Sequence, residues 1–164
     1  MISQGKGILY AAIAGLLAML GGITWYASLD NPQLTMAEIE MSDVKVTSVN
    51  NIDGRANLEV SFLIKNPSEK TFTISNIDYE LFANGVPIGK GQYSTEDIAM
   101  PGRAAFYPGA EIPLPSMFQL VHSNVNSETY NSIVDKEPVT YSAKGTMMIE
   151  SAWSLVEKQF DISQ

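Results

Sequence analysis

The chain has 164 residues, with 10 basic and 18 acidic side chains, a net charge of −8 and no cysteine. This length suits one domain with a sizeable core rather than two. The absence of cysteine excludes disulfides, thiolate metal sites and a cysteine nucleophile. The acidic excess disfavours nucleic acid and anionic lipid headgroups as partners, because both are negatively charged.

Residues 7–29 form an apolar stretch without a charged side chain. At about 1.5 Å per residue, it is long enough to cross a hydrocarbon layer of about 30 Å. A cleaved signal peptide is the alternative, but its apolar region is usually only about 7 to 15 residues long. Trp25 and Tyr26 also stand where an aromatic interface belt is expected. We therefore predict a single retained transmembrane helix at residues 7–29.

The few charges that flank this stretch predict its orientation. Lys6 precedes it, whereas no Lys or Arg occurs between Asp30 and Val44. The positive-inside rule then makes residues 1–6 a cytoplasmic tail and places the rest of the chain outside the cell membrane. Small residues recur every fourth position along two lines, which permits close helix packing or reflects how common they are in such spans: Gly7, Ala11 and Gly15, and Ala14, Ala18 and Gly22.

We interpret residues 30–35 as a short linker and residues 36–164 as one folded domain. Its clearest strand covers residues 57–65, where apolar side chains alternate with polar ones and so predict one buried face: Leu58, Val60, Phe62 and Ile64. Asn66-Pro67 ends this strand, because proline lacks the backbone donor that a ladder needs. An earlier strand carries Ile39, Met41, Val44 and Val46, with a change of phase at Ser42-Asp43.

The next strand changes phase in its middle. Phe72 and Ile74 lie on even positions, whereas the later apolar residues Ile77, Tyr79 and Leu81 lie on odd ones. One extra residue near Ser75 or Asn76, a β-bulge, keeps both sets on the same face. Asn84-Gly85 then predicts a two-residue hairpin turn. Pro87 indicates that the returning strand lies at a sheet edge.

Further extended segments are expected at residues 93–98, 104–107, 110–114, 139–147 and 156–162. From Ser116 the apolar period becomes helical, which predicts one kinked helical segment across the end of the domain. The apolar residues that carry this period are Met117, Leu120, Val121, Val125, Tyr130, Ile133 and Val134. Glu137-Pro138 is expected to end the segment.

Three stretches together resemble a known family: the strand that ends at Asn66-Pro67, the TISNIDYEL run from Thr73 and the ANGVPIGKG hairpin from Ala83. They are similar to the water-stress and hypersensitive-response (WHy) domain of group 2 late-embryogenesis-abundant proteins, over residues 36–162. The resemblance implies a mainly β chain: an antiparallel immunoglobulin-like or fibronectin-like β-sandwich with one helical segment, preceded here by a membrane anchor. It also implies a role in tolerance to desiccation or other stress, and no catalytic residues to carry over.

The residues themselves offer little chemistry. His122, the only histidine, lies away from the apolar stripe of the expected helix, so we interpret it as solvated. Asp78 and Glu80 share the outward face of a strand, where acids are usually solvated. Met147 and Met148 point to opposite faces of a strand, which suits core packing better than metal chelation. We therefore predict no catalytic, cofactor-binding or metal-binding residues, and a protein that is not an enzyme.

Two functions remain. The first is a non-catalytic, membrane-anchored extracytoplasmic module that protects against stress or binds other proteins. The alternative is an accessory subunit of a larger membrane complex, with its single helix packed against partner helices. Both make the membrane a partner through residues 7–29 and expect protein partners. Neither involves nucleic acid, a cofactor or a small-molecule substrate.

Overall fold

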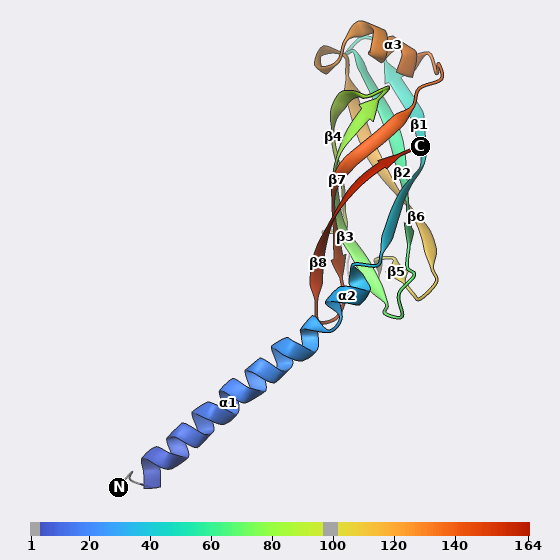
Figure 1. The fold of residues 1–164 in the computed structure, drawn as a ribbon. Coiled ribbons are helices and arrows are strands. Elements are labelled where there is room, and N and C mark those ends of the chain that lie inside the picture. The colour runs from blue at the N-terminus through green and yellow to red at the C-terminus, as the bar shows by residue number, and fades with distance from the viewer. Residues whose placement is uncertain (1–3, 97–101) are drawn as a thin grey trace.

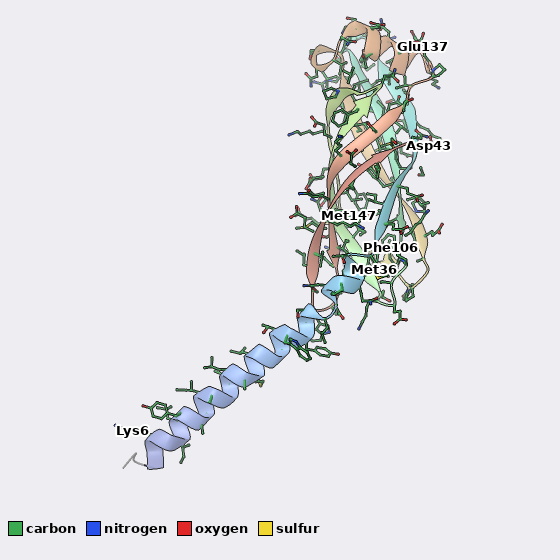
Figure 2. The ribbon with its side chains drawn as sticks, viewed as in Figure 1. Lys6, Met36, Asp43, Phe106, Glu137 and Met147 are labelled. Carbon is green, nitrogen blue, oxygen red and sulfur yellow. The ribbon has the colours of Figure 1, made fainter. Side chains whose placement is uncertain are left out.

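A long N-terminal helix leads into one end of a two-layered β-structure (Figure 1). The computed structural model describes residues 4–96 and 102–164. Helix α1 (Gln4–Ser28) is followed by a turn and by the one-turn helix α2 (Asn31–Leu34). Together they form a bent helix, Gly5–Leu34, that is long and apolar enough to cross a membrane. Its side chains project into open space along α1, from Lys6 near its free end (Figure 2).

Within the described residues, two antiparallel sheets make up the sandwich. The first contains β1 (Glu38–Asn50), β2 (Arg55–Lys65) and β6 (Glu111–Val121), in the order β1-β2-β6. The second has the order β4-β3-β7-β8, from β3 (Phe72–Ala83), β4 (Val86–Ser94), β7 (Tyr141–Glu150) and β8 (Leu155–Ser163). A short strand, β5 (Ala105–Phe106), pairs with the start of β3. The prediction of a mainly β, antiparallel sandwich is confirmed.

The core lies between the sheets and is centred on β2. Every second side chain of β2 is buried, at no more than 1% exposure: Ala56, Leu58, Val60, Phe62 and Ile64. From the opposite sheet, the rings of Tyr79 and Phe160 meet Phe62 edge-on, with centroids 4.9 and 6.1 Å away. The alternation in the sequence therefore closes two layers over a dry interior, as the strand period requires.

Tyr79 also carries a polar link through this core. Its hydroxyl is 2.9 Å from Ser116 Oγ on β6, and Ser116 Oγ donates to the carbonyl of Gln92 on β4. The link joins the two sheets along the side where β4 and β6 lie next to each other. Burial raises the pKa of the Tyr79 phenol, although the hydrogen bond with Ser116 acts in the opposite direction.

Both predicted phase changes are confirmed as register shifts. In β3 the shift falls between Ile74 and Asn76 against β7, and in β1 it falls between Met41 and Asp43 against β2. Each bulge returns the following apolar residues to the inner face.

The hairpin between β3 and β4 is also confirmed. Asn84 and Gly85 have φ angles of 50° and 80°, as the favoured two-residue hairpin turn requires. Pro87 lies on β4, an edge strand of its sheet. The expected strand at residues 93–98 ends at Ser94, and residues 97 and 98 lie outside the described residues.

The helix predicted to begin at Ser116 is wrong for its first part. Residues up to Val121 belong to β6, and alternate side chains point inward: Leu114, Ser116, Phe118 and Leu120. Met117, which the helical period placed in an apolar stripe, is 62% exposed. Pro115 does not end the strand, because β6 is an edge strand and an edge tolerates a missing backbone donor.

The second part of that segment is helical. After a 3-10 turn (η2, His122–Asn124), α3 spans Ser127–Val134, and the Asn126 side chain caps it by accepting from Thr129 N at 2.7 Å. Tyr130 and Ile133 are buried, so α3 covers the end of the sandwich opposite α1, as expected (Figure 1). We call this the distal end. The helix ends at Val134, before the predicted Glu137-Pro138, and the chain turns at Lys136 with φ of 57°.

Candidate functional site at the base of the sandwich

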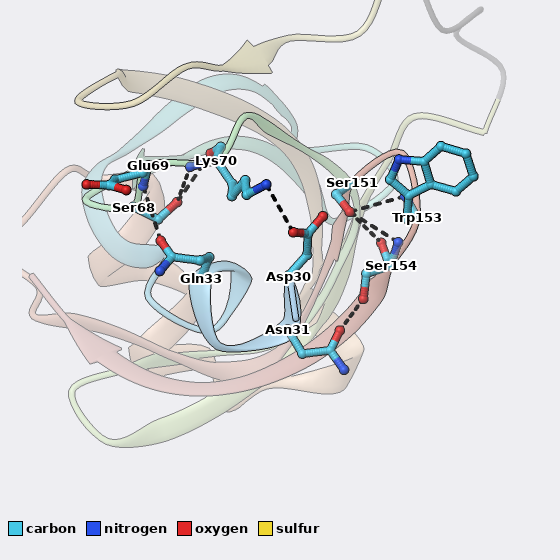
Figure 3. A network of polar contacts seen from close by, with 9 residues as sticks. All are labelled: Asp30, Asn31, Gln33, Ser68, Glu69, Lys70, Ser151, Trp153 and Ser154. Atoms are coloured by element: carbon cyan, nitrogen blue, oxygen red, sulfur yellow. Dashed lines mark hydrogen bonds and ion pairs between the residues drawn. The ribbon is translucent and has the colours of Figure 1, made fainter. Parts of the chain in front are cut away.

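The end of the sandwich that carries α1 is formed by α2, the β2–β3 turn (residues 66–71) and the β7–β8 turn (residues 151–154), and we call it the base (Figure 3). The predicted linker, residues 30–35, contains α2, in whose first turn Pro32 is tolerated because no intrahelical donor is needed there. Leu34 and Ala37 are fully buried in the sandwich core. The connection from α1 is therefore packed into the domain.

Asn66 organises the β2–β3 turn. Its side-chain amide donates to the carbonyls of Lys70 and Phe106 at 2.8 and 2.7 Å. Its side-chain oxygen accepts from the backbone and hydroxyl of Ser68 at 3.0 and 2.7 Å. Asn66 is only 1% exposed, so these bonds satisfy a buried polar group and fix the turn. The Asn-Pro-Ser sequence predicted the turn, and the tendency of Asn to bond its own backbone two residues on was the available signal for this role.

The fixed turn holds α2 from one side. The backbone N–H of Glu69 donates to Gln33 Oε1 at 3.2 Å, and Lys70 Nζ lies 3.3 Å from Asp30 Oδ1. From β8, Lys158 Nζ donates to the carbonyls of Thr35 and Ala37. These polar contacts, drawn in part in Figure 3, complement the burial of α2.

The β7–β8 turn holds α2 from the other side. Ser154 Oγ donates to Asn31 Oδ1, and Ser151 Oγ accepts from the backbone N–H groups of Trp153 and Ser154 at 3.3 and 3.1 Å. The indole of Trp153 is 68% exposed and points away from the turn (Figure 3). It lines an apolar hollow of about 390 Å³ together with one face of α1: Met19, Gly22, Ile23, Tyr26 and Ala27.

Two further hollows lie away from the base. One, of about 420 Å³ at the distal end, lies between β1 and the chain that follows α3, and its lining includes Val46, Ile133 and Tyr141. The other, of about 350 Å³ on the outer face of the β4-β3-β7-β8 sheet, mixes carboxylates and amines: Asp78, Glu80, Lys90 and Lys144. The acids and lysines of this second hollow lie side by side, so their opposite charges compensate one another.

The side chains considered in the sequence analysis belong to η2, β3 and β7. His122 is exposed and rests its ring on Tyr130, with centroids 4.6 Å apart. Asp78 is exposed and Glu80 half-buried on an outer sheet face. Met147 is fully buried, and Met148 faces the other side of the sheet. Within residues 4–96 and 102–164, no group of three His, Cys, Asp or Glu is placed to hold a metal ion.

No protein-family model matches the chain, and no curated protein matches it. Among solved structures, a protein from Arabidopsis thaliana is similar at 14% identity, over 77% of this chain and 81% of that one, with a TM-score of 0.50. This likeness supports the assigned fold. A protein from Archaeoglobus fulgidus matches at 15% identity, over 76% and 94% of the two chains, with a TM-score of 0.46. A candidate late embryogenesis abundant (LEA) protein matches at 14% identity, over 99% and 91%, with a TM-score of 0.42.

Proposed function

We propose that this protein is a membrane-anchored, non-catalytic β-sandwich of the WHy type, which protects other proteins under stress or binds them. The observation that carries the anchoring is the exposed surface of α1. Its large apolar side chains stay open to the surroundings, for example Leu9 at 57%, Leu16 at 56% and Ile23 at 51%. The described sandwich does not cover these side chains. Transfer of so much apolar surface from water into the hydrocarbon of a bilayer is favourable.

The two ends of α1 support an orientation. Trp25 and Tyr26 are 67% and 65% exposed beside the base, where an interfacial aromatic belt would lie. Lys6 is at the opposite end. The sandwich is then extracytoplasmic, and Lys6 stays on the cytoplasmic side.

The stress-related, non-catalytic role rests on different support. The resemblance over residues 36–162 is carried by turns that the structure contains, at Asn66-Pro67 and Asn84-Gly85. His122, the only histidine, is exposed and rests its ring on Tyr130, with centroids 4.6 Å apart. Partners of the sandwich are expected to be proteins that tolerate or prefer an acidic surface.

Membrane anchoring is tested by alkaline carbonate extraction of cell membranes and by protease protection. We expect the full chain to stay in the membrane pellet and its sandwich to be accessible to protease only from outside. Leu16→Arg combined with Leu17→Arg should move the chain to the soluble fraction, because each central arginine costs about 2.5 to 3.5 kcal/mol on insertion. The matched control is Leu16→Ile with Leu17→Ile. The proposal would be contradicted if carbonate moved the unaltered chain into the soluble fraction, or if cells released a shortened product.

Protection is tested with the full chain in lipid nanodiscs. At an equimolar ratio, it should reduce aggregation of a heated or dried enzyme relative to empty nanodiscs. No reduction would contradict the protective role. Migration of the detergent-extracted chain as part of a large native complex would instead support the accessory-subunit function.

A further inference from the structure

We propose that the β7–β8 turn is a second membrane contact, in which Trp153 enters the interfacial layer of the bilayer beside α1. This inference rests on the proposed anchoring of α1 and adds a lipid-binding surface on the sandwich itself. The turn belongs to the folded domain, more than a hundred residues after the helix.

The depth of Trp153 follows from what it faces. The helix residues that share its hollow recur at the spacing of one helix face, from Met19 to Ala27. They lie within the charge-free stretch at residues 7–29. At about 1.5 Å per residue, they stand about 3 to 15 Å before the end of that stretch at Leu29. A bilayer that covers α1 up to Leu29 therefore reaches Trp153 as well.

The chemistry of the turn suits this layer. Residues 151–156 carry no charge, and Trp153 and Leu155 are 68% and 55% exposed. An indole, with its apolar rings and one N–H donor, is favoured where hydrocarbon meets headgroups. Glu150, just before the turn, is paired with Arg103 at 3.4 Å. Glu157 is the first charged residue after the turn, so only the uncharged tip is expected to enter.

The turn is also held in place before any lipid arrives. The Ser151 hydroxyl accepts from two backbone N–H groups of the turn, and Ser154 is tied to Asn31 of α2. This arrangement keeps the indole beside α1 without a further ordering step. The hollow between Trp153 and the Gly22 side of α1 is lined by apolar groups, and a lipid acyl chain is the occupant to which we commit.

The chain contains only two tryptophans, so each can be observed alone. Trp25→Phe leaves Trp153 as the reporter, and Trp153→Phe leaves Trp25. Each full-length variant is reconstituted into phosphatidylcholine vesicles that contain lipids brominated either near the headgroup or near the chain end. For Trp153 we expect emission that is blue-shifted relative to tryptophan in water. Its emission should be quenched more by bromine near the headgroup than by bromine near the chain end. Trp25 should be quenched too and serves as the positive control for anchoring.

The outcomes separate the two proposals. If Trp25 is quenched and Trp153 is not, α1 spans the bilayer and the second contact is wrong. If neither is quenched, the anchoring itself fails. Blue-shifted Trp153 emission that resists brominated lipid and depends on protein concentration would indicate a second protein copy in the hollow, and would overturn the lipid assignment.

Discussion

The helix α1 and the interior of the sandwich are both rich in apolar side chains, yet they differ in where those side chains go. On β2, Val60 and Phe62 are fully buried, whereas Leu16 and Ile23 on α1 remain about half exposed. Alternation gives each strand one apolar face, and two such faces close over each other. A continuous apolar run gives a helix that is apolar all round and needs an apolar surrounding. Sequence period thus decides whether the chain buries its own apolar surface or leaves it exposed, as on α1.

Among substitutions that test this difference between α1 and the core, Phe62→Ala is expected to have the largest effect on stability. It opens a cavity between the two sheets and should lower the free energy of unfolding of the sandwich by about 3 to 5 kcal/mol. Chemical denaturation of the full chain in detergent measures this loss. Met117→Ala on the exposed face of β6 is the control, expected within about 0.5 kcal/mol. A loss below about 1 kcal/mol for Phe62→Ala would contradict the assignment of the core. The Phe62→Ala variant should still stay in the membrane pellet on carbonate extraction, as is expected of the unaltered chain.

Leu34→Ala tests where the helix stops and the sandwich begins. Leu34 is fully buried, so its truncation should cost about 3 kcal/mol of sandwich stability, although the residue continues the bent N-terminal helix. Leu29→Ala, at a side chain that is 49% exposed, should have little effect in the same denaturation measurement. Equal effects of the two substitutions would mean that α2 is not part of the domain core.

Asn66→Ala should cost about 1 to 3 kcal/mol, because it removes the side-chain donor to the buried carbonyl of Phe106 and the acceptor for the backbone N–H of Ser68. Asn57→Ala is the matched control, since the Asn57 amide bonds the exposed Ser48 hydroxyl. Thermal unfolding of both variants provides the measurement. A similar melting temperature for the two would show that the Asn66 bonds do not fix the base.

Asp30→Asn should have the smallest effect, up to about 1 kcal/mol. The Asp30 side chain is only 16% exposed, but that of its partner Lys70 is 51% exposed, and an ion pair that water reaches contributes little. The loss should shrink further at high salt, because salt screens the pair in the unaltered chain. Denaturation at low and high salt checks this. A loss of several kcal/mol, independent of salt, would mean that the pair is effectively buried.

Much of the fold could be predicted because its signals are local. The bulge beside Asn76 follows from a change of phase within one strand, and the turn at Asn84-Gly85 follows from two residues that tolerate positive φ. The helical prediction from Ser116 failed because Met117 and Leu120 happen to be three positions apart. The alternation that continues through Phe118 was the better guide.

The base could not be predicted, because its contacts join distant parts of the chain. Gln33 and Glu69 are 36 residues apart, and Asn31 and Ser154 are 123 apart. No local period or spacing pairs such residues. The position of Trp153 beside α1 could not be predicted for the same reason, since an isolated tryptophan in a turn belongs to no periodic pattern.

The length of the strands sets how far a partner bound at the distal end lies from α1. A strand such as β2, with 11 residues at about 3.3 Å each, extends for roughly 36 Å. The hollow at the distal end therefore lies from α1 at a distance several times the electrostatic screening length of about 8 Å in physiological salt. With α1 in a bilayer, a partner bound at that hollow would be screened from the charge of the lipid surface. The strands work as a spacer as well as a core.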